Sequence, residues 1–292
     1  MPKERAVRLR LEAIASMLDQ RGPVELDNLA VDLRAVERRL ESGQYQESDF
    51  AARNIFDVAR RTREYLTYLQ GWQRQAVQWA ELLRAADPEP TDVLDLCPGP
   101  APKVELALCR LGFRGRMRVL DKDEPSLVAL ANFMTLFSPS FSIEGVRGDV
   151  FDDPPRAQSP LVVANHAIDD LVLDLWSTRS GASTLDLYED ETKLSEAWRA
   201  LLSESRAVLR SMPETIAAAL GRHVTPNGKL VLVQYPSHHE GLLGVEGVGA
   251  LFLEVFDRVL ESLREKEFID YPVDPRSAMP NKSTAVLVAP PR

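Results

Sequence analysis

The sequence predicts an α/β protein whose mostly parallel sheet carries helices on both faces and is preceded by an all-helical region. Two observations predict this fold class. From Thr91 onward, short apolar runs alternate with helical stretches, which is typical of parallel β/α units. Before Thr91 there is no convincing strand, and apolar side chains recur at helical spacing.

Residues 1–88 are predicted to form a helical N-terminal region. Apolar faces run through 7–18 and 26–40, and a longer pattern with steps of four and three covers 51–83. We expect this longer face to pack on neighbouring helices or on the next domain, as a cap. The alternative is pairing with a second copy of the chain, which would make a homodimer through the N-terminal helices.

Residues 89–292 are predicted to form the second domain, with seven candidate strands. The runs are 93–96, 118–121, 141–149, 161–165, 229–235, 266–271 and 284–290. The gap between the fourth and fifth runs is too long for one crossover helix, and it contains a polar inserted loop at 177–192. Long insertions at a sheet edge are more often functional than idle.

Charge and composition limit the classes of partner. The formal net charge is −9, and residues 1–88 hold 14 Lys+Arg against 14 Asp+Glu, so the whole acidic excess belongs to 89–292. This makes nucleic acid an unfavoured partner. No segment has the length of a membrane span and the start lacks a secretory pattern, so we expect a cytoplasmic protein. Cys97 and Cys109 are too few for a disulfide framework, and both are expected to be reduced.

The stretch VLDLCPGPAPKVELAL, residues 93–108, joins a strand to a helix through a tight turn. Such a turn aims backbone N–H groups and the positive end of the helix dipole at one point. Gly99 is its one glycine, and Cys97 and Ala101 occupy the other two positions of close approach. The helix is expected to begin near Pro102, where a missing N–H costs little. A plain strand, turn and helix without a ligand is the alternative.

Acidic residues end the next two strands. Asp121 stands 22 residues after Gly99, at the end of the second run, and Asp149 ends the third. Open α/β sheets place at the first of these positions an acid that accepts hydrogen bonds from ribose hydroxyls. The spacing therefore favours a nucleoside-containing ligand.

With these motifs the chain resembles the class I S-adenosylmethionine-dependent methyltransferases. That family has a Rossmann-like, seven-stranded sheet whose last strand is antiparallel and inserted beside the fifth. The resemblance covers roughly 91–290 and rests on VLDLCPGPA, VLDKDEPSL, VRGDVFD and LVVANHAIDDL. It implies S-adenosylmethionine as the cofactor and a methyltransferase activity. The helical N-terminal region and the long insertion after the fourth strand together suggest an enclosed pocket, so we expect a small-molecule substrate. The resemblance also implies the cofactor-binding residues: Asp95, Cys97, Gly99 and Ala101 along the methionine part, Asp121 at the ribose, Asp149 and Val150 at the adenine, and in addition Lys122 and Asn165.

Three other functions use the same architecture. A dinucleotide oxidoreductase is disfavoured because a pyrophosphate needs several free N–H groups, and a loop with three prolines and one glycine offers few. Transfer of the aminocarboxypropyl group from the same donor is the nearest enzymatic alternative. A catalytically silent member of the fold that binds a partner protein is the third.

The candidate catalytic residues follow the fourth strand. Methyl transfer needs alignment of the nucleophile and, for a hydroxyl or ammonium, removal of a proton. His166 is the candidate base, and Asp169 or Asp170 is spaced to orient it along a helix. The alternative is structural: Asn165 caps that helix and the two aspartates interact with its dipole.

Candidate substrate-binding residues come from two further segments. Tyr235, His238 and His239 follow the fifth strand, and Tyr188 lies in the inserted loop. Adjacent histidines in an extended chain point to opposite faces and chelate poorly, so we predict no metal site.

Overall fold

The computed structural model describes residues 62–99, 101–134, 140–188, 190–204, 206–236, 240, 243–274, 277–279 and 281–291. The faces predicted at 7–18 and 26–40, and the first part of the pattern at 51–83, lie outside these residues. The predicted homodimer contact through the N-terminal helices lies only in part within them, from residue 62 onward.

All seven predicted strands are present in one sheet. They are β1 (Asp92–Leu96), β2 (Arg116–Asp121), β3 (Ile143–Arg147), β4 (Ser159–Asn165), β5 (Val224–Gln234), β6 (Ile269–Asp270) and β7 (Ser283–Val288). The spatial order is β3-β2-β1-β4-β5-β7-β6. β1 to β5 are parallel, and β7 is antiparallel to both β5 and β6. The seventh strand is thus inserted beside the fifth, as the resemblance implies.

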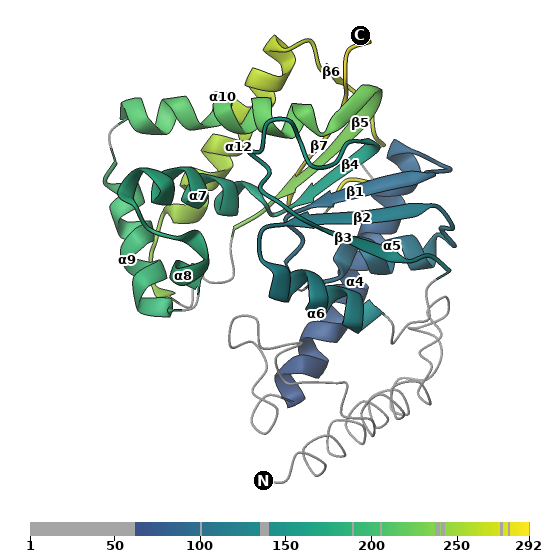
Figure 1. Ribbon diagram of the computed structural model, residues 1–292, viewed down its shortest axis with the longest axis horizontal. Coiled ribbons are helices and arrows are strands. Elements are labelled where there is room, and N and C mark those ends of the chain that lie inside the picture. The colour runs from purple at the N-terminus through teal and green to yellow at the C-terminus, as the bar shows by residue number, and fades with distance from the viewer. Residues whose placement is uncertain are drawn as a thin grey trace.

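Helices cover both faces of the sheet (Figure 1). They are α4 (Thr62–Ala86), α5 (Lys103–Arg110), α6 (Glu124–Met134), α7 (Ile168–Ser180), α8 (Thr184–Tyr188), α9 (Glu191–Leu202), α10 (Arg206–Arg222) and α12 (Val248–Glu265). Successive strand side chains point to opposite faces, so Val93 packs in one core and Leu94 in the other. α4, α5 and α6 bury their apolar residues in the first core, and α7, α9, α10 and α12 bury theirs in the second.

α4 shares the core of the sheet. Trp79, Leu82 and Leu83 are fully buried, and they belong to the same apolar cluster as Val93 of β1. α4 packs mainly against α5. The positions of the regular apolar pattern at Trp72, Ala76, Trp79 and Leu83 are therefore covered by this chain's own α/β unit.

The inserted segment 177–192 is not the irregular loop that its polar composition suggests. Ser177–Ser180 complete α7, which ends at Gly181 in the left-handed conformation (φ 75°). α8 follows, and α9 begins after Asp190, whose side chain accepts from the N–H groups of Thr192 and Lys193. Local capping at both ends thus makes helix out of a segment that has little apolar periodicity.

β5 begins at Val224, five residues before the predicted start at 229. Pro226, Asn227 and Gly228 form a typical turn sequence, yet they lie within the strand. Asn227 has φ 58°, and the register of β5 against β4 shifts between Ser159 and Leu161. The strand therefore continues through an irregularity that the turn residues accommodate.

Candidate functional site

The loop after β1 lies where the strand order reverses direction, between β1 and β4. Cys97 and Gly99 both have left-handed backbone conformations, with φ 52° and 58°. The Cys97 N–H donates to the carbonyl oxygen of Leu120 at 2.9 Å, which ties the loop to β2. α5 begins at Lys103 with Pro102 at its N-cap, as predicted. In open α/β sheets such a switch point is the usual place of a ligand crevice.

Asp121, the last residue of β2, holds this loop in place. Its carboxylate accepts from the N–H of Gly99 at 3.3 Å and from the N–H of Asp123 at 2.9 Å. The side chain is buried yet lines the adjoining cavity. A carboxylate has about four acceptor positions, so it is able to hold the loop and to receive hydroxyl groups of a ligand as well.

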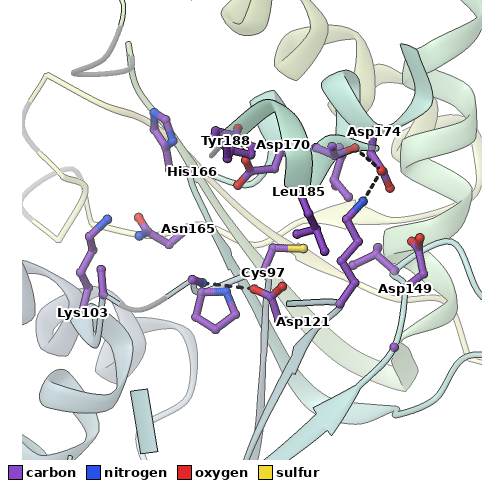
Figure 2. Close-up of a pocket in the computed structure, with 18 of the residues that line it drawn as sticks. Cys97, Lys103, Asp121, Asp149, Asn165, His166, Asp170, Asp174, Leu185 and Tyr188 are labelled. Carbon is purple, nitrogen blue, oxygen red and sulfur yellow. Dashed lines mark hydrogen bonds and ion pairs between the residues drawn. The ribbon is translucent and has the colours of Figure 1, made fainter. Parts of the chain in front are cut away.

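A cavity of about 270 Å³ lies along the carboxyl ends of β1, β2 and β4. Figure 2 shows His166, Asn165 and Lys103 at one side of it, and Asp149, Asp174 and Leu185 at the other. Cys97 and Asp121 lie between the two sides. The remaining lining residues are Trp72, Pro98, Gly99, Ala101, Lys122, Gly148, Val150, Asp170, Leu171, Thr184 and Tyr188.

At the Asp149 side of the cavity, the carboxylate of Asp174 connects α7 to α8 and to the residue that follows β2. Asp174 of α7 forms an ion pair with Lys122, just after β2, and accepts from the hydroxyl of Thr184 of α8 at 2.6 Å. Asp149 itself lines the cavity, and burial raises its pKa. Val150, Leu171 and Leu185 add apolar surface. This combination of apolar walls and acceptors suits a planar, hydrogen-bonding heterocycle.

At the opposite side, His166 and Asp169 form a hydrogen-bonded pair. Nδ1 of His166 lies 3.1 Å from Oδ2 of Asp169, and both side chains are largely buried. Nε2 is buried and has no hydrogen-bond partner among the described residues. Because the carboxylate accepts the Nδ1 proton, the neutral imidazole presents an unprotonated Nε2. That atom is placed to take a proton from a ligand.

The buried Gln234 fixes Asp169 from behind. Its Oε1 accepts from the N–H of Ile168 at 3.3 Å, and its Nε2 lies 3.5 Å from Oδ1 of Asp169. His166 has φ 58°, and its N–H donates to the carbonyl oxygen of Val233 at 2.7 Å. The imidazole is therefore held by its backbone as well as by its carboxylate partner.

Burial and charge act in opposite directions on His166. Burial lowers the pKa of the imidazole, but the charge and hydrogen bond of Asp169, with a further contribution from Asp170, raise it above its usual value. For Cys97, burial and the nearby charges of Asp121 and Asp170 raise the pKa of the thiol well above its ordinary value. The protonated thiol is therefore a wall of the cavity and not a nucleophile.

Two tyrosines lie near His166. Tyr188 of α8 lines the cavity and its hydroxyl donates to Asp170. Tyr235 is not among the lining residues, but its ring centroid lies 4.3 Å from that of His166, and its hydroxyl accepts from Nζ of Lys103 at 3.0 Å. α8 therefore brings Tyr188 directly to the cavity, whereas Tyr235 supports two side chains that line it.

Behind the loop, Asp95 and Glu105 form a buried carboxyl pair. Asp95 is 2% exposed and Glu105 is 0% exposed. Burial raises the pKa of Asp95 well above its ordinary value, and Glu105 raises it further. Burial also raises the pKa of Glu105 to about 7. Neither residue lines the cavity.

The structure brings most of the predicted site residues to one cavity, while Asp169 and Tyr235 contact His166 from behind its wall and Asp95 is enclosed. His238 and His239 lie outside the described residues. Asn165 ends β4 and does not cap α7, whose N-cap is Ala167. The predicted site residues that line the cavity are Cys97, Gly99, Ala101, Asp121, Lys122, Asp149, Val150, Asn165, His166, Asp170 and Tyr188.

Sequence reasoning missed several residues of this site. Lys103 could have been found as the first residue of the helix after the loop, and Gln234 as the polar end of an apolar strand. No sequence pattern identifies Asp174 or Thr184 as site residues, because their roles depend on how α7 and α8 pack together. Trp72 reaches the cavity from α4, which is distant in sequence from the rest of the site.

Two further findings concern only the described part of the chain. No group of three or more His, Cys, Asp or Glu side chains there is arranged to hold a metal ion. None of the helices described is long and apolar enough to cross a membrane.

No model of a protein family matches the sequence, and no curated protein matches it. Solved structures with a similar course of the chain include TrmN from Thermus thermophilus, at 17% identity and a TM-score of 0.42 over 73% of this chain. The chain covers 48%, about half, of TrmN.

Two others were solved with ligands. The plantazolicin methyltransferase BpumL in complex with SAH is 11% identical, with a TM-score of 0.46 over 86% of this chain and 98% of BpumL. Human N-acetylserotonin methyltransferase in complex with SAM is 12% identical, with a TM-score of 0.43 over 87% of this chain and 65% of that enzyme. The fold assignment rests on strand order and direction: this chain has the fold of the class I S-adenosylmethionine-dependent methyltransferases.

Proposed function

We propose that this chain is an S-adenosylmethionine-dependent methyltransferase that acts on a small molecule. The observation that carries the proposal is the loop at Gly99, held to Asp121 at the switch point of a sheet whose seventh strand is antiparallel and lies beside the fifth.

The residues present fit the methyl donor along the whole cavity. Asp121 would accept from the ribose hydroxyls, and the Asp149 side, with its apolar walls, would hold the adenine. Oδ1 of Asn165 is buried without a hydrogen-bond partner among the described residues, so it is available to a donor group of the ligand, such as an ammonium. The loop residues between these points would contact the methionine part.

The same loop disfavours a dinucleotide cofactor. Pro98 and Pro102 have no N–H to offer a phosphate. The N–H of Gly99 already donates to Asp121, and the N–H of Cys97 to Leu120. A pyrophosphate placed here would therefore find few free donors, whereas a sulfonium amino acid needs no phosphate cradle.

His166 is the proposed general base. The bound donor supplies an electrophilic methyl group whose sulfur leaves as a neutral thioether. Nε2 of His166 would take the proton of an acceptor hydroxyl as its oxygen forms the bond to the methyl carbon, or the proton of an acceptor ammonium before its nitrogen, then carrying a lone pair, forms that bond. Asp169 would stabilise the resulting imidazolium, and Gln234 would keep Asp169 in place.

Two observations support a small acceptor. The cavity is flanked by side chains of α4 and α8, namely Trp72, Thr184, Leu185 and Tyr188, in addition to the strand ends. The acidic excess of residues 89–292 opposes binding of a nucleic acid backbone.

Calorimetric titration tests the donor site directly. We expect the protein to bind S-adenosylmethionine and S-adenosylhomocysteine, and not NAD, because the loop lacks free donors for a pyrophosphate. Absence of binding to both sulfur ligands by folded protein contradicts the proposal and favours a silent scaffold. Binding of NAD alone favours the oxidoreductase.

Asp121 provides the matched variants. Asp121→Ala should abolish donor binding, and Asp121→Asn, which keeps the shape of the side chain, should weaken it at least tenfold. The control is Asp257→Ala, at an exposed aspartate of α12, which should bind as the wild type does. Urea unfolding of each variant reports whether the fold is retained.

A further inference from the structure

Two lysine ammonium groups meet at one tyrosine on the His166 side of the cavity. Nζ of Lys103, which lines the cavity, donates to the hydroxyl of Tyr235 at 3.0 Å. Nζ of Lys282 lies 4.2 Å from the centroid of the same ring. The ring of His166 also contacts Tyr235, at a centroid distance of 4.3 Å. Positive charge is therefore concentrated next to the proposed base.

The sheet brings these three residues together from distant parts of the sequence. Lys103 is the first residue of α5, Tyr235 directly follows β5, and Lys282 directly precedes β7. Because β7 is antiparallel to β5, its first residue, Ser283, pairs with Gln234 at the end of β5. Tyr235 and Lys282 are consequently neighbours at the end of the sheet that carries the cavity, behind its lining residues.

In the described part of the chain, the charge of Lys103 acts on the buried carboxyl groups of Asp95 and Glu105, whose pKa values burial raises, and neither of these carboxyl groups lines the cavity. Neither Lys103 nor Lys282 forms an ion pair there, although Lys122 does. Nζ of Lys282 is buried and has no hydrogen-bond acceptor among those residues. Burial, and then the charge of Lys103, lowers the pKa of Lys282 to about 8. A buried ammonium without an acceptor is unfavourable, and an anion would remove that cost.

The carboxylates of the cavity are already engaged elsewhere. Asp121 accepts from two backbone N–H groups, Asp149 from the N–H of Phe151, Asp170 from Tyr188, and Asp174 from Lys122 and Thr184. Within the described part of the chain, no ion pair balances the two ammonium groups, and we take a ligand as the source of the balancing negative charge.

We propose that Lys103 and Lys282, joined through Tyr235, form a subsite for a carboxylate group beside His166. This inference rests on the proposed function, because it assigns a ligand chemistry to the same cavity. A carboxylate has two sources in such an enzyme. One is the methionine part of the donor, and the other is an acidic acceptor whose reactive atom faces Nε2 of His166.

The first experiment examines the donor as the source. S-adenosylhomocysteine and 5′-methylthioadenosine share a nucleoside and a thioether, but only the first has an amino-acid part. If the donor's carboxylate occupies the subsite, Lys103→Met and Lys282→Met should each lower the affinity for S-adenosylhomocysteine at least tenfold, as measured by calorimetry. The affinity for 5′-methylthioadenosine should stay within about twofold of the wild type.

The second experiment examines the acceptor as the source. Benzoate is titrated against free and S-adenosylhomocysteine-saturated protein and followed by saturation-transfer NMR, with benzamide as the uncharged counterpart. An acceptor carboxylate predicts that benzoate binds the wild type and benzamide does not. It also predicts that both Lys→Met variants no longer bind benzoate but still bind S-adenosylhomocysteine.

The controls separate a lost charge from a damaged fold. Lys282→Arg keeps a cation and should retain most of the binding, and Lys266→Met, at an exposed lysine after α12, should change nothing. The subsite is refuted if both Lys→Met variants match the wild type in both experiments, or if the wild type itself shows neither effect. Failure to bind S-adenosylhomocysteine or 5′-methylthioadenosine at all refutes the proposed function instead, and benzoate with the free protein still decides the subsite.

Discussion

Two of the side chains that line the cavity are attached to backbone in the left-handed region, Cys97 at φ 52° and His166 at φ 58°. A residue other than glycine in this conformation costs of the order of 1–3 kcal/mol. In both cases a short backbone hydrogen bond to a neighbouring strand holds the conformation, to Leu120 and to Val233. The sheet thus fixes the direction of two site side chains that an unstrained backbone would point elsewhere.

The pairing of His166 with Asp169 makes a prediction that needs no substrate. Asp169→Asn should lower the pKa of His166, because the carboxylate charge and hydrogen bond are what raise it above its usual value. Histidine titration by two-dimensional NMR measures this, with His166→Gln to assign the resonance. Methyl transfer that uses His166 as a base should accordingly fall as the pH drops below the wild-type pKa, and this limb should move to lower pH in Asp169→Asn.

The matched control for that titration is Asp257→Asn, which changes an exposed carboxylate on α12. It should leave the pKa of His166 where it is in the wild type. An unchanged His166 pKa in Asp169→Asn would show that the two side chains do not interact in solution.

The buried Glu105 makes a prediction about stability. Its pKa rises to about 7 in the folded protein from an ordinary 4.5, so the folded state keeps a proton that the unfolded state releases in this window. Stability therefore falls as the pH rises through that range. Glu105→Gln should increase the free energy of unfolding at pH 8 by about 1–3 kcal/mol, with a smaller gain at pH 5.

Urea unfolding at the two pH values measures this difference. Glu214→Gln, at an exposed position of α10, is the control and should have no effect at either pH. A gain for Glu105→Gln that is the same at pH 5 and pH 8 would mean that the carboxyl group does not titrate in this window.

At the scale of elements, two helices outside the β/α repeat complete the site. α4 contributes Trp72 to the cavity from the N-terminal side, and α8 contributes Thr184, Leu185 and Tyr188 from the inserted segment. α8 is a five-residue helix between α7 and α9, and Thr184 connects it to Asp174 of α7. The long segment between the fourth and fifth strands therefore contributes lining residues to the cavity, in line with the functional role that its length suggested.

α4 supplies a prediction about domain organisation. Trp79 is 0% exposed within the core that α4 shares with the sheet, so Trp79→Ala should lower the free energy of unfolding by about 3–5 kcal/mol. Val77 lies on the same helix but is 40% exposed, so Val77→Ala should cost less than about 0.5 kcal/mol. Urea unfolding compares the two variants.

If the two costs were equal and small, α4 would belong to a separate helical unit that ends near residue 88. A large loss of stability for Trp79→Ala, in a single cooperative transition, would instead mean that α4 belongs to the α/β domain and that the domain begins before α4. The shared apolar cluster leads us to expect the second result.

At the scale of the whole molecule, the regular strands were predictable because their apolar runs are short and bounded by polar residues. β1, β2 and β4 lie within two residues of their predicted bounds at each end. The start of β5 was not predictable, because Pro226, Asn227 and Gly228 form a turn sequence within the strand. Capping by Gly181 and Asp190 likewise produced helix in a segment that was predicted to be a loop.

The sequence by itself determined the order of strands and helices, the loop at Gly99 and the acids Asp121 and Asp149, because these depend on local pattern and on spacing along the chain. Only the tertiary structure decided which side chains meet. The hydrogen bond of Gly99 to Asp121, the support of His166 by Gln234 through Asp169, and the contacts of Lys103 and Lys282 with Tyr235 join residues from different elements. Such contacts are set by sheet register and strand direction, which no single segment of sequence specifies.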